Sequence, residues 1–141
     1  GQVIYYVGPS PTPPGRVCGS AGPTTSGRMD PYTPLLLDLG LKGMIGKGRR
    51  SPEVIESMIK NRAVYFGAVG GAAVLISDCI TRLEAVAWPE LGAEAVFRLR
   101  VEDLPTVVLI DAFGNDLYRD GPARYRGGGP PPVEEEPAGG L

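Results

Sequence analysis

Glycine and proline are concentrated toward the two ends of this 141-residue chain, and this distribution limits where a folded core can form. The first 34 residues hold 13 of them and the last 22 hold 11, whereas residues 35–119 hold only 12. Residues 120–141 also lack the apolar side chains whose burial offsets the entropy of ordering a chain. We therefore expect a globular domain over residues 1–119, with a proline-rich loop near its start, and a disordered Gly/Pro/Glu-rich tail over residues 120–141.

The globular part alternates between patterns typical of strands and patterns typical of helices. Apolar, β-branched and aromatic runs predict strands at 3–7, 43–46, 63–68, 84–88, 96–101 and 106–111. Helices are expected over 31–39, from the cap Ser51 through 59, and through Leu75, Ile76 and Ile80. The last two strands, on either side of Pro105, look paired with each other. This alternation favours an α/β layer architecture and leaves the strand order open.

A polar loop at residues 23–28 precedes a predicted helix start. Asp30 is a suitable N-cap, and Pro31 suits the first helical position. The loop would then face the positive end of the helix dipole, where backbone N–H groups and an arginine favour a carboxylate or a phosphate. The alternative is a loop whose hydroxyls only cap the helix. The candidate anion-binding residues are Thr24, Thr25 and Arg28.

A basic turn follows the predicted strand at 43–46. Lys47 lies between two glycines, which leave its side chain clear of neighbours and let a ligand approach the backbone. We predict that Lys47 shares a cleft with the loop at 23–28, because ligands gather at strand ends in open α/β sheets. The alternative is a solvated lysine, and we interpret Arg49 and Arg50 as surface charges. The turn does not match a Walker A phosphate loop.

Charge and metal-ligand content exclude several classes of function. Residues 16–50 carry six cations against two acids, and residues 84–136 carry eleven acids against five cations, so a small anion is favoured and nucleic acid is not. The chain has two cysteines and no histidine, and alone it cannot build the usual zinc site, an iron–sulfur cluster or a histidine-activated nucleophile. Nothing marks it as secreted, and its opening apolar run is too short to span a membrane, so we expect a cytoplasmic protein with unbridged cysteines.

Five motifs stand in order along the chain. They are YYVGP at 5–9, GSAGPTTSGRMD at 19–30, MIGKG at 44–48, YFGAVGGAA at 65–73 and GNDLY at 114–118. Together they resemble the β subunit of the iron–sulfur class I fumarate hydratases and tartrate dehydratases. The resemblance covers residues 3–119.

The resemblance implies the swivelling β/β/α domain of that family, an α/β fold with a mixed sheet and flanking helices. It implies an α subunit that carries a four-iron four-sulfur cluster, in a hetero- or homo-oligomer, while this chain binds no metal. Thr24 matches the family's proposed proton-transfer residue, and Arg28 and Lys47 match residues that bind the dicarboxylate substrate. Thr25 is expected to orient the substrate. The implied reaction is the reversible dehydration of malate to fumarate.

The chain also departs from the family pattern. Family β units usually begin with several dozen further residues, including an Arg-Asp-Ala-Ala-His segment that supplies another substrate-binding arginine, and nothing here corresponds to it. We therefore expect the isolated chain to be inactive. Three alternatives stay open: tartrate in place of malate as the substrate, a non-catalytic anion-binding assembly domain, and a phosphate-binding regulatory module.

Overall fold

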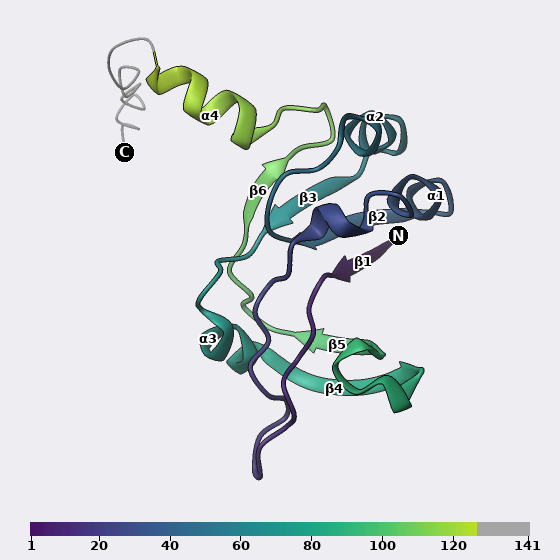
Figure 1. The fold of residues 1–141 in the computed structure, drawn as a ribbon, viewed down its shortest axis with the longest axis vertical. Coiled ribbons are helices and arrows are strands. Elements are labelled where there is room, and N and C mark those ends of the chain that lie inside the picture. Colours follow the sequence, from purple (N-terminus) through teal and green to yellow (C-terminus); the bar gives the residue numbers. More distant parts are fainter. Residues whose placement is uncertain (127–141) are drawn as a thin grey trace, which may run out of the picture.

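The computed structural model describes residues 1–126, which form two separate sheets (Figure 1). The larger sheet has the strand order β1-β2-β3-β6, in which β1, β2 and β3 are parallel and β6 is antiparallel to β3. Its strands are β1 Gln2–Tyr5, β2 Leu41–Gly46, β3 Val64–Gly67 and β6 Val107–Ile110. The smaller sheet pairs β4 Ile80–Ala87 with β5 Val96–Val101, antiparallel. The predicted α/β class, with a mixed sheet and flanking helices, is confirmed.

Helices lie in the connections between the parallel strands, because two parallel neighbours cannot be joined by a tight turn and need a longer crossover. The helices are α1 Thr33–Asp38, α2 Pro52–Asn61, α3 Ala73–Asp78 and α4 Leu117–Tyr125, and the 3-10 turns are η1 Ser26–Met29 and η2 Pro89–Glu94. At the start of α2, the Ser51 side chain accepts a hydrogen bond from the Val54 N–H at 3.4 Å. This confirms the prediction that a serine cap followed by proline opens this helix.

The main core lies between the four-stranded sheet and the helices α1 and α2, which pack side by side (Figure 1). Its buried members are Tyr6, Leu37, Leu41, Met44, Val54, Met58, Ala63, Tyr65, Leu109 and Ile110. A smaller cluster, formed by Cys18, Ala21 and Ile80, lies against the two-stranded sheet. The long loop between β1 and η1 therefore has apolar anchors of its own.

The predicted pairing of the last two strands is wrong. β5 pairs with β4, and β6 pairs with β3 in the larger sheet. The reason is burial: Leu109 and Ile110 of β6 belong to the main core, whereas Leu99 of β5 packs on the smaller cluster. Each strand thus joins the sheet that buries its apolar face. Ile80, which was expected in the helix through Leu75, instead begins β4.

The predicted cap at Asp30 is also wrong. Helix α1 begins at Thr33, and its N-cap position is Tyr32, which makes no side-chain cap hydrogen bond. Asp30 instead ends η1, and its carboxylate accepts hydrogen bonds from residues 50 and 51. The loop at 23–28 therefore does not lie at the start of a long helix, and the dipole argument for an anion there does not apply.

The predicted domain boundary after residue 119 falls inside α4, so residues 120–125 are helical. The remainder of the predicted tail, residues 127–141, lies outside the described residues. Between residues 1 and 126, no helix combines the length and the apolar character needed to cross a bilayer. Both cysteines are free thiols, as expected.

Candidate active site

The two stretches that the sequence singles out as anion-binding lie side by side. Thr25 and Lys47 form an isolated parallel bridge. The Ser26 N–H donates to the Lys47 carbonyl at 3.0 Å, and the Lys47 N–H donates to the Thr24 carbonyl at 3.2 Å. Lys47 directly follows β2, so the two stretches meet at the carboxyl ends of the parallel strands, where open α/β sheets bind ligands.

Lys47 is exposed, and its side chain extends toward the loop that follows β3. A Cβ atom placed on Gly70, in that loop, would lie 3.6 Å from the Lys47 ammonium nitrogen. The next residue, Gly48, has a φ of +85°, a conformation that favours glycine. Lys47 therefore reaches the loop at Gly70 while its side chain stays exposed.

Thr24 is half-buried and anchored to the end of β1. Its N–H donates to the Tyr6 carbonyl at 2.8 Å, and its hydroxyl donates to the same oxygen at 3.0 Å. The lone pairs of the Thr24 hydroxyl oxygen remain able to accept a hydrogen bond. Thr25, in contrast, is exposed.

Arg28 is the exposed basic residue of η1. The residue before it, Gly27, packs tightly on the basic turn, because a Cβ atom there would lie 3.3 Å from the Arg49 carbonyl oxygen. Among residues 1–126, neither Arg28 nor Lys47 forms a side-chain ion pair. The backbones of the two predicted stretches are thus brought together, and both keep an uncompensated cation.

A buried tyrosine of β3 forms hydrogen bonds with both stretches. The Tyr65 hydroxyl lies 2.9 Å from Ser26 Oγ and 3.0 Å from the Gly48 carbonyl oxygen. Because a carbonyl can only accept, the tyrosine donates to Gly48 and accepts from the serine. Burial raises the pKa of Tyr65, so this hydroxyl keeps its proton. Gly46 is also required, because a Cβ atom there would lie 1.9 Å from Ser26 Oγ.

Arg50 is buried, and the prediction that it is a surface charge is wrong. Its Nε donates to Asp30 Oδ1 at 2.7 Å, and its Nη2 donates to Thr33 Oγ1 at 2.8 Å. The guanidinium carbon lies 5.3 Å from the centroid of the Tyr6 ring and 5.1 Å from that of Tyr65. The sequence offered no signal for this site, because its members are scattered along the chain.

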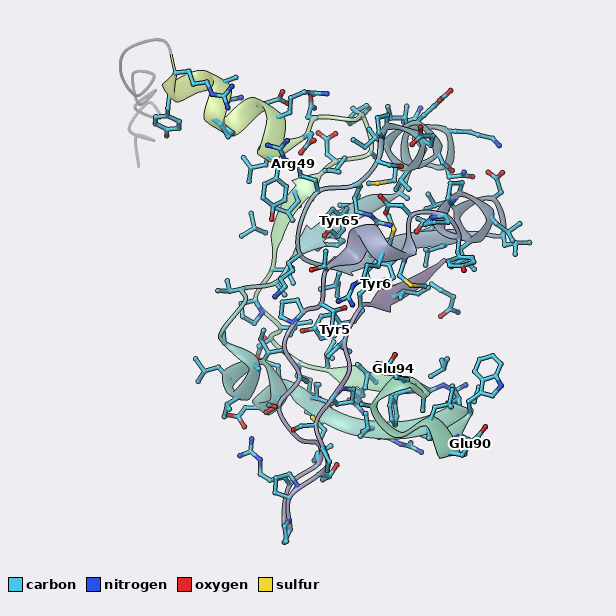
Figure 2. The ribbon with its side chains drawn as sticks, in the orientation of Figure 1. Tyr5, Tyr6, Arg49, Tyr65, Glu90 and Glu94 are labelled. Carbon is cyan, nitrogen blue, oxygen red and sulfur yellow. The ribbon has the colours of Figure 1, made fainter. Side chains whose placement is uncertain are left out.

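Figure 2 labels Tyr6 and Tyr65, the two tyrosines whose rings flank the Arg50 guanidinium, and it shows Arg49 apart from both of them. Arg49 is exposed, as the sequence predicted.

The described residues do not supply the ligands of an iron–sulfur cluster. Within residues 1–126, no three histidine, cysteine, aspartate or glutamate side chains gather where they could hold a metal ion. The chain as a whole contains two cysteines and no histidine, fewer thiolates than a cluster requires.

Residues 1–121 match the model of a protein family described as the fumarase C-terminus. The chain belongs to this family. Members to which it is similar include the anaerobic class I fumarate hydratase of Escherichia coli, at 48% identity over 118 residues, or 82% of this chain and 22% of the relative. Fumarate hydratase 2 of Leishmania major is 45% identical over 117 residues, or 82% of this chain and 21% of the relative.

A third relative bears the name of a subunit. It is a protein of Methanocaldococcus jannaschii provisionally named L(+)-tartrate dehydratase subunit beta, 34% identical over 125 residues, or 84% of this chain and 64% of the relative. The chain thus spans about a fifth of the length of the fumarate hydratases that it matches. Its family members are hydro-lyases by name.

Proposed function

We propose that this chain is the part of a class I fumarate hydratase that binds the substrate carboxylates and transfers a proton, in the reversible dehydration of malate to fumarate. The observation that carries the proposal is the bridge between Thr25 and Lys47, which brings two cationic stretches to one edge of a parallel sheet. Membership of the fumarase C-terminus family supports the choice of a small dicarboxylate.

Arg28 and Lys47 are the proposed carboxylate-binding residues. Both are exposed and neither forms an ion pair within residues 1–126, so each is able to meet a substrate anion. The guanidinium of Arg28 offers two parallel donors to a carboxylate, and the ammonium of Lys47 offers a point charge. Thr25, which is bridged to Lys47, is placed to orient the same substrate.

Thr24 is the proposed proton-transfer residue. Its hydroxyl donates to the Tyr6 carbonyl, so its oxygen can take a proton from a substrate carbon only when its own proton passes to a base that the assembled enzyme supplies. A neutral threonine is a weak base, and its action requires an activating neighbour in the assembled enzyme.

We propose that a four-iron four-sulfur cluster, the cofactor implied by the resemblance, is held by an α-type partner and not by this chain. The scarcity of ligands supports this: no three histidine, cysteine, aspartate or glutamate side chains gather within residues 1–126 where they could hold a metal ion, and the whole chain has only two thiols. The subunit name of the archaeal relative favours a multi-chain enzyme. The isolated chain is accordingly proposed to be inactive.

Tartrate dehydration is the second candidate, because the archaeal relative carries that name. Substrate profiling separates the two reactions. The assembled enzyme, meaning this chain combined with an α-type partner or with the rest of its own polypeptide, is assayed with fumarate, malate and L(+)-tartrate. Preference for fumarate and malate supports the first proposal, and preference for tartrate replaces it with the second.

The experiment that tests the site uses Arg28→Ala and Lys47→Ala in the assembled enzyme. Loss of one charge-assisted hydrogen bond costs about 1.5 to 3 kcal/mol, so kcat/KM falls by at least about tenfold in each variant. Arg82→Ala is the matched control, since this arginine is exposed on β4 in the smaller sheet. Wild-type kinetics in Arg28→Ala contradicts the proposal. A wild-type complex that assembles stably but has no hydro-lyase activity also contradicts it and favours an assembly domain.

A further inference from the structure

The buried Arg50 and its partner Asp30 lie next to the proposed substrate-binding residues along the chain. Asp30 follows Arg28 by two positions, and Arg50 follows Lys47 by three. Both oxygens of the Asp30 carboxylate are occupied across this junction: Oδ1 accepts from Arg50 Nε at 2.7 Å, and Oδ2 accepts from the Ser51 N–H at 2.7 Å. The pair therefore joins the segment that carries one proposed carboxylate binder to the segment that carries the other.

The Arg50 site is built for a guanidinium. The side chain is completely buried, and its partner carboxylate is only 13% exposed. Besides Asp30, it donates to Thr33 Oγ1 at 2.8 Å and to the Met44 sulfur at 3.2 Å, and two tyrosine rings flank it. A lysine carries one compact ammonium group and cannot make this set of contacts.

The position of Arg28 depends on this pair. On one side of Arg28, the Ser26 N–H is bonded to the Lys47 carbonyl, and on the other side Asp30 is bonded to Arg50 and Ser51. Loss of the Arg50 guanidinium removes its hydrogen bonds to Asp30 and to Thr33, which are among the contacts that hold the C-terminal side of η1 to the basic turn. Arg28 is then free to move relative to Lys47, and the hydrogen bonds of the Ser26 and Ser51 amides across the junction open more often.

We propose that Arg50 and Asp30 are positioning residues: their buried ion pair holds Arg28 and Lys47 at the spacing that one dicarboxylate requires. This inference rests on the proposed function of those two cations. A buried ion pair is by itself weak evidence for a stabilising contribution. The inference therefore gives Arg50 a role in positioning and does not depend on how much the pair stabilises the fold.

The first test is amide hydrogen exchange on the full 141-residue chain. The reference is the Ala63 amide, whose hydrogen bond to the Met58 carbonyl at the end of α2 reports global opening. In Arg50→Lys, the protection of the Ser51 and Ser26 amides should fall at least about tenfold more than that of the Ala63 amide. Ile80→Ala, a cavity variant in the smaller cluster, is the matched control and should lower protection without this local excess. Equal losses at all three amides in Arg50→Lys would overturn the proposal.

A second variant covers the case in which Arg50→Lys fails to fold. Asp30→Ala/Arg50→Met removes both charges together, so it leaves no buried unpaired ion, a replacement that proteins often tolerate, and it leaves no side-chain acceptor for the Ser51 N–H. We expect near-wild-type stability together with the same local loss of protection at Ser51 and Ser26. Retention of wild-type protection at both amides in this folded variant would count against the proposal.

The second test is kinetic and uses the assembled enzyme. Arg50→Lys should raise KM for fumarate about tenfold or more with a smaller change in kcat, because Arg28 and Lys47 bind the carboxylates in both ground and transition states. Ile80→Ala should leave KM unchanged. An unchanged KM in Arg50→Lys, alongside a raised KM in Arg28→Ala, overturns the positioning role alone. Wild-type kinetics in Arg28→Ala instead overturns the proposed function, and the exchange experiment still decides whether the pair fixes η1.

Discussion

Removing the Tyr65 hydroxyl should destabilise the contact between the loop at 23–28 and the basic turn at Lys47. Tyr65→Phe keeps the ring in the main core but removes the bond to the Gly48 carbonyl at 3.0 Å and the bond with Ser26 Oγ at 2.9 Å. Each bond contributes about 1 kcal/mol net, and an unsatisfied buried hydroxyl costs about 1 to 3 kcal/mol. Ser26 is completely buried, so we expect the free energy of unfolding to fall by about 2 to 4 kcal/mol.

Urea unfolding of the full chain measures this change, and a double-mutant cycle assigns it. Ser26→Ala/Tyr65→Phe should cost less than the sum of the two single variants by about 1 kcal/mol or more, because the double variant leaves no orphaned serine hydroxyl. Tyr32→Phe is the control: this tyrosine is 62% exposed, and its substitution should change stability by less than about 0.5 kcal/mol. An additive cycle, or a Tyr65→Phe value as small as that of the control, would refute the reasoning.

Three further predictions concern the residues around the same junction. Thr24→Val in the assembled enzyme should lower kcat by about a hundredfold or more, whereas Thr24→Ser should retain most of it; equal rates in the two variants would remove Thr24 from proton transfer. Gly46→Ala should destabilise the chain by about 1 to 3 kcal/mol in urea unfolding, because its methyl group would overlap Ser26 Oγ, and a neutral result would show that Ser26 can move aside. Burial raises the pKa of Tyr5 to about 12, so the stability from its neutral hydroxyl, bonded to the Ala21 carbonyl, is complete below pH 10 and lost as pH rises through 12. Unfolding measured across this window should show a shallower loss in Tyr5→Phe, and identical pH profiles would contradict the assignment.

Local signals in the sequence predicted the elements that local chemistry determines. Ser51 and Pro52 placed the start of α2 correctly, because capping depends on residues within one turn. The sequence also predicted that the loop at 23–28 and Lys47 share one edge of the sheet, and the bridge between Thr25 and Lys47 brings their backbones together there.

Long-range partners could not be read from local patterns. Asp30 carries the residue type of an N-cap, but the buried guanidinium of Arg50, twenty positions away, competes successfully for its carboxylate. A basic turn is typical of a solvent-exposed segment. No residue next to Arg50 in the sequence indicates that two tyrosine rings flank its guanidinium in the fold. The partners of β5 and β6 were likewise decided by which cluster buries each strand.

The most direct test of the central claim is a crystal structure of the assembled enzyme with a bound C4 dicarboxylate. The account predicts that the Arg28 guanidinium and the Lys47 ammonium group both contact carboxylate oxygens of the same ligand molecule, at about 2.7 to 2.9 Å. A ligand bound without either group, or an Arg28 side chain directed away from the Lys47 ammonium, would contradict it.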